Sequence, residues 1–248
     1  MRIHFLGTNG WYNTATGETS CVLIDAREAY VVLDAGQGIR KLDQHITDPQ
    51  KPIVLFLSHL HLDHTYGFHT FPQFRFVQGM SIITQRGSEQ HLRTLINSPW
   101  TAPIDRLKFK LTIQEIDEGV HTSPVPFECR FQVHADPSLG FRFTLEGKTI
   151  TYCTDTGVCD AVHALARNAD FLITECAWRV PNEKPGWPHL APADCAMIAK
   201  TANAKQLLLM HFDAPNYPSF VERTAAEATA RAIFPNTRAM RDDDVVEV

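Results

Sequence analysis

The sequence predicts an α/β protein built as an αββα sandwich, in which two mixed β-sheets pack face to face and helices flank them. Short apolar runs alternate with turn residues along the chain and read as strands. These strands come in two sets, the first without and the second with intervening helices, which is typical of two layered sheets. The run Pro52–Leu57 is continuously apolar, as expected for a strand buried on both faces.

The length of 248 residues favours a single domain over residues 1–248, since the chain shows no internal repeat and no linker rich in proline, glycine or serine. Hydrophobic residues make up 44% of the chain and charged residues 21%, as in an ordinary globular protein. This composition excludes a disordered chain, a collagen-like fibre and a coiled coil.

Periodicity and turn residues predict the individual elements. The expected strands are Ile3–Leu6, Cys21–Asp25, Tyr30–Asp34, Pro52–Leu57, Ser81–Thr84, Phe109–Ile116, Phe127–Val133, Gly140–Leu145, Thr149–Cys153, Asp170–Thr174 and Gln206–Met210. The expected helices are Ser88–Asn97, capped by Ser88, and Val158–Arg167, Pro192–Ala202 and Phe220–Ile233. We also expect two hairpins, with turns at Ala26–Ala29 and at Glu146-Gly147, and a solvated turn at Asp242–Asp244.

The net charge of −5 disfavours binding of a long nucleic acid through bulk charge, because such binding needs a basic surface. No signal pattern opens the chain and no apolar stretch is long enough to span a bilayer, so we expect a cytoplasmic protein with no membrane partner. The six cysteines form no C-x-x-C motif and mostly lie in apolar runs. We therefore expect buried free thiols.

The strongest chemical signal is the segment Ser58–His64 (SHLHLDH), which follows the buried strand directly. An extended segment would send His59 and His61 to one face, and a turn after His61 could bring Asp63 and His64 to a second position. Imidazole and carboxylate groups suit Zn²⁺, and so many ligands cannot serve one tetrahedral ion without strain. The segment therefore predicts two adjacent metal sites.

Two metal sites need further ligands, and three polar residues follow later strands. His134 follows Phe127–Val133, Asp155 follows Thr149–Cys153, and His211 follows Gln206–Met210. Each is weak evidence alone, because a polar residue after a strand is common. Together they complete two sets of three ligands and a bridging group.

These residues resemble those of the metallo-β-lactamase fold superfamily, and specifically its phosphodiesterase branch, which contains ribonuclease Z. The likeness covers nearly the whole chain. Besides the histidine motif, it rests on Phe5-Leu6-Gly7-Thr8, Leu33-Asp34-Ala35-Gly36, His134 with Gly140-Phe141-Arg142-Phe143, Thr154-Asp155-Thr156, Glu175, Gly186-Trp187-Pro188-His189 and Met210-His211-Phe212.

The resemblance implies a binuclear centre of two Zn²⁺ ions, with Mn²⁺ or Fe²⁺ as substitutes. One ion would be held by His59, His61 and His134, the other by Asp63, His64 and His211, and Asp155 would bridge them together with a water or hydroxide. That hydroxide would be the nucleophile, with Asp63 orienting or deprotonating the water. A histidine at position 61 favours hydrolysis, because relatives that carry out iron redox chemistry commonly have a carboxylate there.

The resemblance also assigns a catalytic role to Glu175 and His189. In this branch the histidine faces the reacting phosphate, where it stabilises the transition state or protonates the leaving oxygen. The glutamate fixes its tautomer and raises its pKa. The alternative for His189 is an ordinary loop residue ahead of the next helix.

Supporting roles are also expected. Asp34 is predicted to lie behind a metal-binding histidine and accept its second N–H, and Ser58 is a weaker candidate for the same role. A cluster of aromatic residues, expected mainly as core packing or else as a pocket wall, comprises Phe68, Phe71, Phe74, Phe76 and Trp100. The candidate phosphate partners are Arg75, Arg86, Arg142, Lys148, Arg179 and Lys184.

The favoured function is hydrolysis of a small phosphodiester, such as a cyclic nucleotide or cyclic sugar phosphate. Members of the branch that process transfer RNA carry a long arm between the segments that here hold His134 and Asp155, and this chain has no room for one. Processing of RNA 3′ ends and hydrolysis of a lactone or thioester on the same metal pair remain the alternatives. Relatives often form homodimers, and nothing in the sequence marks such an interface.

Overall fold

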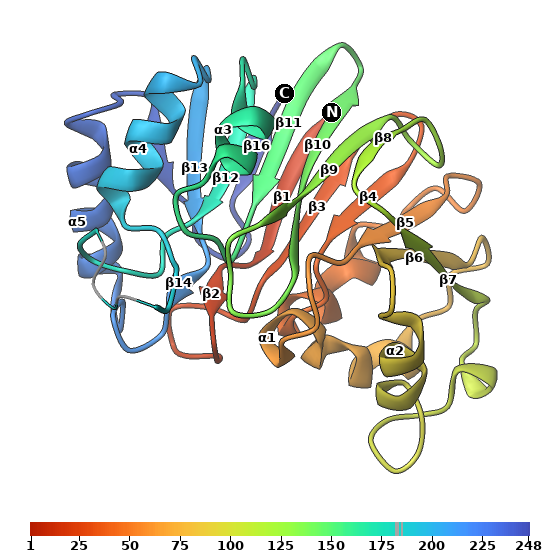
Figure 1. Ribbon diagram of the computed structural model, residues 1–248. Coiled ribbons are helices and arrows are strands. Elements are labelled where there is room, and N and C mark those ends of the chain that lie inside the picture. The colour runs from red at the N-terminus through yellow and green to blue at the C-terminus, as the bar shows by residue number, and fades with distance from the viewer. Residues whose placement is uncertain (182–183, 185) are drawn as a thin grey trace.

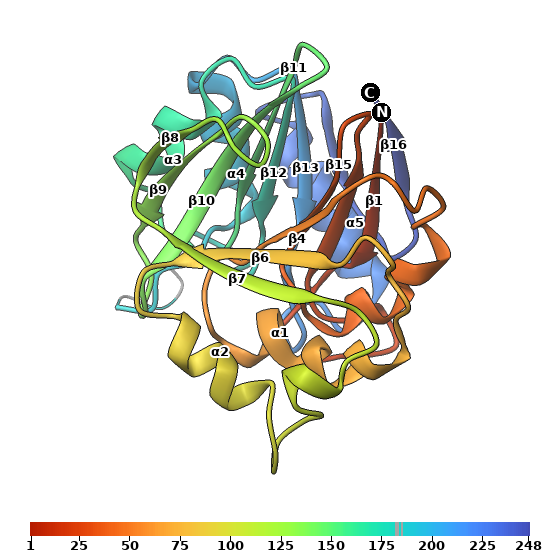
Figure 2. The same cartoon turned by 90° about the vertical axis from the view of Figure 1, so that its right-hand side faces the viewer.

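The structure is a computed structural model that describes residues 1–181, 184 and 186–248. It has the predicted αββα architecture, with two large sheets packed face to face and helices on both outer sides (Figures 1 and 2). The first sheet has the spatial order β16 (Val245–Glu247), β1 (Arg2–Gly7), β3 (Cys21–Asp25), β4 (Tyr30–Leu33), β5 (Ile53–Phe56), β6 (Met80–Gln85) and β7 (Leu111–Ile116). The second has the order β15 (Thr237–Ala239), β13 (Gln206–Met210), β12 (Phe171–Glu175), β11 (Lys148–Cys153), β10 (Ser138–Leu145), β9 (Phe127–Gln132) and β8 (Gly119–His121).

Both sheets are mixed, as predicted. In the first, β4, β5, β6 and β7 run parallel, whereas β3 is antiparallel to both β1 and β4. In the second, β11, β12, β13 and β15 are parallel and β8 to β11 are antiparallel. A short parallel pair, β2 (Asn9–Gly10) and β14 (Phe212–Asp213), lies near one edge of the sandwich. The carboxyl ends of parallel strands meet at one edge of a sheet, which is where such folds present functional groups.

The helical segments cover the outer faces. The first sheet is covered by the 3₁₀ segments η1 (Gln37–Gln44) and η2 (Tyr66–Gln73) and by α1 (Leu62–Thr65) and α2 (Glu89–Leu95), with the 3₁₀ turn η3 (Ile104–Arg106) nearby. The second is covered by α3 (Asp160–Ala166), α4 (Pro192–Thr201) and α5 (Phe220–Arg231).

The central core lies between the two sheets and joins them through phenylalanine rings. The Phe56 ring on β5 makes edge-to-face contacts with three rings that belong to the second sheet. The centroid distances are 4.9 Å to Phe127, 5.4 Å to Phe141 and 4.8 Å to Phe143. All four side chains are buried. Such ring pairs contribute beyond their buried area, so this cluster fixes how the sheets dock.

The structure corrects several predicted details. The helix expected at Ser88–Asn97 is α2, Glu89–Leu95, and the Ser88 side chain makes no capping hydrogen bond. The strand expected from Phe109 begins at Leu111, because Phe109 packs instead in the core under the first sheet. The strands β2, β8 and β14 to β16 were not predicted, since they are too short to show a periodic pattern, and the 3₁₀ segments were not predicted either.

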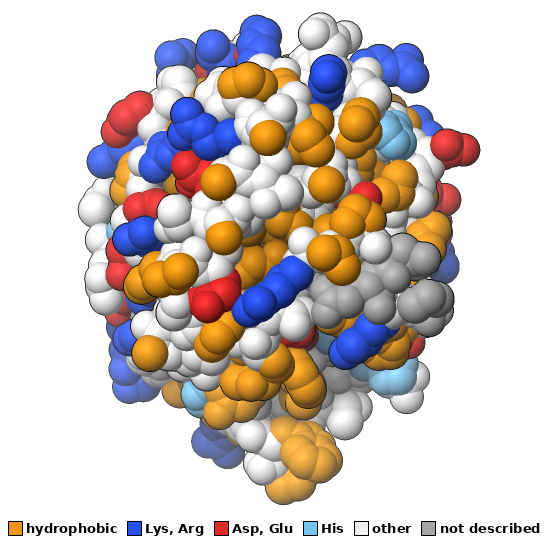
Figure 3. Space-filling view, turned by 90° about the vertical axis from the view of Figure 1, so that its left-hand side faces the viewer, with side chains coloured by type: hydrophobic (Ala, Val, Ile, Leu, Met, Phe, Trp, Pro, Cys, Tyr) orange, Lys and Arg blue, Asp and Glu red, His pale blue; other side chains and the backbone are white. Residues whose placement is uncertain are grey.

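Other expectations concern the surface and the thiols. Among the described residues no helix combines the length and apolar character needed to cross a bilayer. On the face formed by α4 and α5, basic and acidic side chains are interspersed with hydrophobic ones (Figure 3). All six cysteines are free, and all are buried except the half-buried Cys159.

Asp242, expected in a solvated turn, is instead a structural carboxylate. Its Oδ1 accepts hydrogen bonds from the backbone N and the Oγ1 of Thr8, at 2.9 and 2.8 Å. Its Oδ2 accepts from the backbone N of Glu18 at 2.9 Å and from Lys41 Nζ at 3.2 Å. These bonds tie the C-terminal segment to the loop that follows β1.

We predict that Asp242→Asn lowers the free energy of unfolding by about 2 kcal/mol, the cost of leaving a buried donor unsatisfied. Whichever way the amide lies, its NH₂ faces at least one backbone N–H that needs an acceptor. Urea denaturation measures the change. Asp243→Asn is the matched control, because the Asp243 side chain is 70% exposed and asparagine tolerates its positive φ. Equal stability of the two variants would contradict the role given to Asp242.

Candidate metal centre

The predicted site residues lie together because strands of both sheets end at the same edge of the sandwich. The histidine motif follows β5, His134 follows β9, and Asp155 follows β11. Glu175 is the last residue of β12, and His211 lies between β13 and β14. The structure therefore brings together residues that are up to 152 positions apart in the sequence. Loops held by buried strands position such groups rigidly.

The turn expected after His61 is the start of a helix. His61 occupies the N-cap position of α1 without a side-chain capping hydrogen bond, and the single turn of this helix contains Asp63 and His64. The His59 and His61 rings contact each other at a centroid distance of 4.6 Å, and His134 Nε2 lies 3.3 Å from His61 Nδ1. These three histidines form one group whose ligand atoms lie within 4.8 Å of one another.

A second group consists of Asp63, His64 and His211, again with ligand atoms within 4.8 Å. Asp155 lies between the groups. Its Oδ2 is 2.9 Å from His64 Nε2 and 3.0 Å from His211 Nε2, and its Oδ1 is 3.9 Å from His134 Nε2. Asp155 also groups with His59 and His64, and with His134 and His189, so the structure brings all seven predicted ligands together without dividing them between two ions.

The donor atoms of this cluster fit a cation. Ser58 Oγ donates to Asp34, so it accepts the Nδ1–H of His59 at 3.0 Å. His59 Nε2 then carries a lone pair, and this buried nitrogen has no hydrogen-bond partner. Burial lowers the pKa of His59 well below its usual value, which keeps the ring neutral. A buried polar atom without a partner is costly unless an ion or a water satisfies it.

His64 lies in an environment that favours positive charge. Its Nδ1–H donates to Asp34 Oδ2 at 2.8 Å, so Nε2 of the neutral ring is a lone pair. That lone pair lies 2.9 Å from the Asp155 carboxylate and 3.1 Å from His211 Nε2. Burial lowers the pKa of His64, but the surrounding carboxylates raise it well above the usual value. The carboxylates around His64 therefore favour a positive charge at Nε2, which either a proton or a bound divalent cation can supply.

Asp34 lies directly behind the cluster, as predicted, and is fully buried. Its Oδ1 accepts from Ser58 N at 2.7 Å. Its Oδ2 accepts from Ser58 Oγ at 2.9 Å, from His64 Nδ1 at 2.8 Å and from the Tyr152 hydroxyl at 2.7 Å. Groups in this position orient a ligand histidine and fix its tautomer.

Glu175 and His189 form the predicted pair. His189 Nδ1 lies 2.9 Å from both carboxylate oxygens of the fully buried Glu175. Burial lowers the pKa of His189, but the charge and hydrogen bonds of Glu175 more than offset this and raise it to about 9. Because Nδ1 is engaged by Glu175, Nε2 is the ring nitrogen left to act on a substrate.

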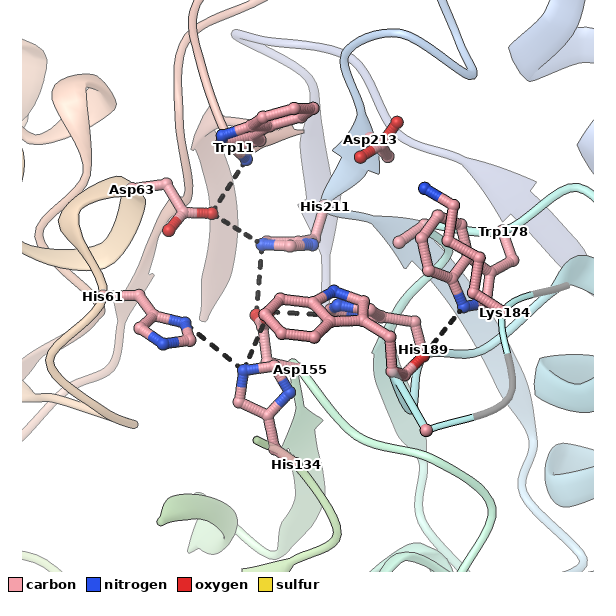
Figure 4. Close-up of a pocket in the computed structure, with 13 residues that line it drawn as sticks. Trp11, His61, Asp63, His134, Asp155, Trp178, Lys184, His189, His211 and Asp213 are labelled. Atoms are coloured by element: carbon pink, nitrogen blue, oxygen red, sulfur yellow. Dashed lines mark hydrogen bonds and ion pairs between the residues drawn. The ribbon is translucent and has the colours of Figure 1, made fainter. Parts of the chain in front are cut away.

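A pocket of about 660 Å³ opens over the cluster (Figure 4). Asp63 and Trp11 lie on one side of Asp155 and His211, and His189, Trp178 and Lys184 lie on the other. Of the described residues that line the pocket, Lys184 is the only lysine or arginine, and its Nζ lies 4.8 Å from the centre of the Trp178 ring.

The other candidate phosphate partners lie away from this pocket. Arg75 donates to backbone carbonyls of its own loop, Arg86 pairs with Asp117, and Arg142 donates to the carbonyls of Leu165 and Arg167. Lys148 lies at the exposed end of a hairpin, and Arg179 Nε donates to the carbonyl of Asn216.

The expected aromatic cluster divides into core and surface. Phe68, Phe71, Phe74 and Phe76 are buried under the first sheet, which confirms the core interpretation, whereas Trp100 is exposed and remote from the pocket.

Sequence reasoning missed the role of Trp11, which lines the pocket with its backbone N donating to Asp63 Oδ2 at 2.8 Å. No motif marks this residue. In the structure its backbone has a positive φ, as do Asp34, Asp155 and His211. Such conformations are uncommon for residues other than glycine and tend to lie at functional sites.

The fold and site are those of a metal-dependent hydrolase of the metallo-β-lactamase type, and comparison with known proteins agrees. The chain belongs to the family described as "Beta-lactamase superfamily domain", whose model matches residues 29–212. It is 25% identical to ribonuclease Z of Latilactobacillus sakei over 100% of this chain and 98% of that protein. It is 27% identical to ribonuclease Z of Synechocystis over 100% of this chain and 94% of that protein.

Solved structures show the same fold. The metallo-β-lactamase fold protein YhfI of Bacillus subtilis superposes with a TM-score of 0.77 at 19% identity, covering 99% of both chains. The short form of human tRNase Z gives 0.75 at 20% identity, covering 100% of this chain and 99% of that one. A diphosphatase of the PhnP family gives 0.73 at 16% identity, covering 100% and 97%.

We predict that Asp34→Asn lowers the free energy of unfolding more than Tyr152→Phe does. In Asp34→Asn the amide NH₂ faces donors whichever way it lies, which costs about 2–3 kcal/mol. Tyr152→Phe removes one of several donors to Asp34 and should cost about 1 kcal/mol. Chemical denaturation monitored by fluorescence gives both values, with Asp43→Asn on the exposed surface as the control. The opposite ranking would rule out Asp34 as the organising carboxylate.

Proposed function

We propose that this protein is a cytoplasmic, single-domain, binuclear metal-dependent phosphodiesterase that acts on a small phosphodiester. The observation that carries the proposal is the Glu175–His189 pair, which lies at the pocket beside seven converging metal-ligand candidates. A histidine polarised by a buried carboxylate suits the protonation of a leaving oxygen or the stabilisation of negative charge on phosphate.

We assign the metal-binding residues as the family resemblance implies. His59, His61 and His134 would hold one ion, Asp63, His64 and His211 the other, and Asp155 would bridge them. Zinc is the proposed metal, because imidazole and carboxylate ligands suit it, with Mn²⁺ or Fe²⁺ as substitutes. Such ions, when bound, lower the pKa of a coordinated water and neutralise charge on a phosphoryl oxygen.

The residues of the chain have distinct tasks. The pKa of Asp63 lies well below its usual value, since interactions with His64 and His211 outweigh the effect of burial, and the ionised carboxylate can orient the attacking water. His189 would donate a proton from Nε2 to the leaving oxygen. Glu175 is a positioning residue that holds Nδ1. Lys184, the one lysine or arginine among the described residues that line the pocket, would attract the anionic substrate.

A small substrate is favoured over a long RNA. The alignment with the ribonuclease Z of L. sakei extends over 308 positions, whereas this chain has 248 residues, so that relative has segments that this chain lacks. The net charge of −5 also opposes binding of a polyanion. The second candidate is RNA 3′-end processing, favoured by the likeness to ribonucleases Z along the whole chain.

We predict about two metal ions per chain and metal-dependent hydrolysis of bis(p-nitrophenyl) phosphate and of at least one cyclic nucleotide or cyclic sugar phosphate. Elemental analysis measures the metal, and a panel of diesters with a tRNA precursor, a lactone and a thioester measures the activity. Removal of the metal with a chelator should abolish turnover, and Asp63→Ala should do the same.

The outcomes separate the candidates. Cleavage of the tRNA precursor with little turnover of small diesters would favour RNA processing. Two metals with turnover of only the lactone or thioester would overturn the phosphodiesterase proposal. Failure to bind metal would overturn the assignment of the ligands.

We predict that His189→Ala lowers kcat/KM for a diester by about 10²–10⁴-fold, the usual contribution of general acid–base catalysis. The metal content should stay near that of the wild type, because His189 lies outside both proposed ligand sets; a large loss of metal would instead make His189 a ligand together with His134 and Asp155. Glu175→Gln should lower kcat less and shift the pH profile, since it weakens the partner that sets the pKa of His189. Full activity of His189→Ala would show that the role assigned to it is wrong.

A further inference from the structure

A second groove, of about 280 Å³, adjoins the main pocket on the side of Asp63. The two hollows share Trp11 and Asp63, so a ligand bound at the metal centre can extend from one into the other. The walls of the groove carry exposed aromatic and apolar side chains, namely those of Trp11, Tyr12, Leu62 and Tyr66. Large side chains in such a cluster mark a binding surface more often than isolated exposed ones do.

Trp11 is the central residue of this groove, and folding alone does not explain its conformation. Its side chain is 65% exposed, so burial contributes little to its position. Its φ of 69° lies in the left-handed region, which is unfavourable for a bulky residue. A tryptophan that is both strained and exposed is a candidate for direct contact with a ligand.

The segment around Trp11 is held firmly relative to the catalytic groups. The Trp11 backbone N donates to Asp63 Oδ2 at 2.8 Å, and the Tyr12 backbone N donates to the carbonyl of Gly10 at 2.9 Å. Gly10 belongs to β2, which pairs with β14 next to His211, and its Cα lies so close to the His211 ring that a Cβ would be 2.5 Å from it. The backbone that carries the indole is therefore anchored beside the candidate metal ligands Asp63 and His211.

The position of the groove indicates which part of a diester it would receive. His189, the proposed donor to the leaving oxygen, lies on the opposite side of Asp155 and His211 from Trp11 (Figure 4). In an in-line displacement the attacking oxygen lies opposite the leaving oxygen, and the retained ester group lies to the side of that axis. With the leaving group beside His189, the groove next to Asp63 and Trp11 is open to the retained group. A cyclic sugar phosphate without a base would leave this groove empty.

We propose that Trp11, flanked by Tyr12 and Tyr66, is a stacking subsite for a nucleobase, so that the substrates are nucleotide phosphodiesters whose retained ester group carries the base. This inference rests on the proposed phosphodiesterase function. Every base has a flat π-face that stacks on an indole, and such stacking tolerates different sequences. Trp11 thus determines specificity and takes no part in the chemical step.

The test compares two p-nitrophenyl phosphodiesters with the same leaving group, one with thymidine through its 5′ oxygen as the retained group and the other with methyl. We expect a higher kcat/KM for the thymidine ester in the wild type. In Trp11→Asn, which tolerates the positive φ, the ratio of the two kcat/KM values should fall about 5- to 150-fold, the range for stacking one base. Trp11→Tyr should restore most of the ratio, and Trp100→Ala, also an exposed tryptophan but remote from the pocket, should leave it unchanged.

An unchanged ratio in Trp11→Asn would overturn the subsite while leaving the phosphodiesterase function intact. If the wild type cleaves neither ester, the proposed function fails, and calorimetric binding of thymidine 5′-monophosphate then tests the subsite by itself. Weaker binding to Trp11→Asn than to the wild type and to Trp100→Ala supports the subsite, and equal or absent binding in all of them overturns it.

Discussion

The rest of the site depends on the hydrogen bonds that the buried carboxylate of Asp34 accepts. It lies at the end of β4 in the first sheet and accepts the hydroxyl of Tyr152, which belongs to β11 in the second. The same carboxylate holds Ser58 and His64. One carboxylate therefore joins the two sheets and orients the histidine motif. A buried carboxylate needs hydrogen-bond donors, and this one accepts one hydrogen bond at Oδ1 and three at Oδ2.

Much of the fold could be predicted because the buried strands have clear apolar patterns. The run that contains β5 and the hairpins β3–β4 and β10–β11 lie where the turn residues indicate. The shortest strands could not be predicted, since β2 and β14 to β16 have two or three residues each and depend on pairing with distant segments. Asp242 was misjudged for the same reason. Its partners, Thr8 and Glu18, are more than 200 positions away in the sequence.

The polar groups of the candidate site could be predicted from the sequence, whereas the aromatic residues of the pocket could not. The polar groups are confined to strand ends and carry recognisable spacing, so the sequence identified them, and the structure places them in one cluster. The pairing of His189 with Glu175 followed from family likeness and has the expected geometry. The aromatic side of the pocket was missed, because Trp11 and Trp178 reach it through loop conformations that no local pattern encodes.

The ring cluster around Phe56 has a consequence for how this enzyme tolerates change. Phe56 lies three positions before His59, and its ring is held between side chains of the opposite sheet. The groups on the two sides of the pocket follow strands of different sheets. The packing of the ring cluster therefore sets the distance between these groups. A smaller side chain at position 56 would leave each sheet intact yet allow the two to slip. The size of apolar side chains far from any substrate is thereby as strictly constrained as the position of the reacting groups.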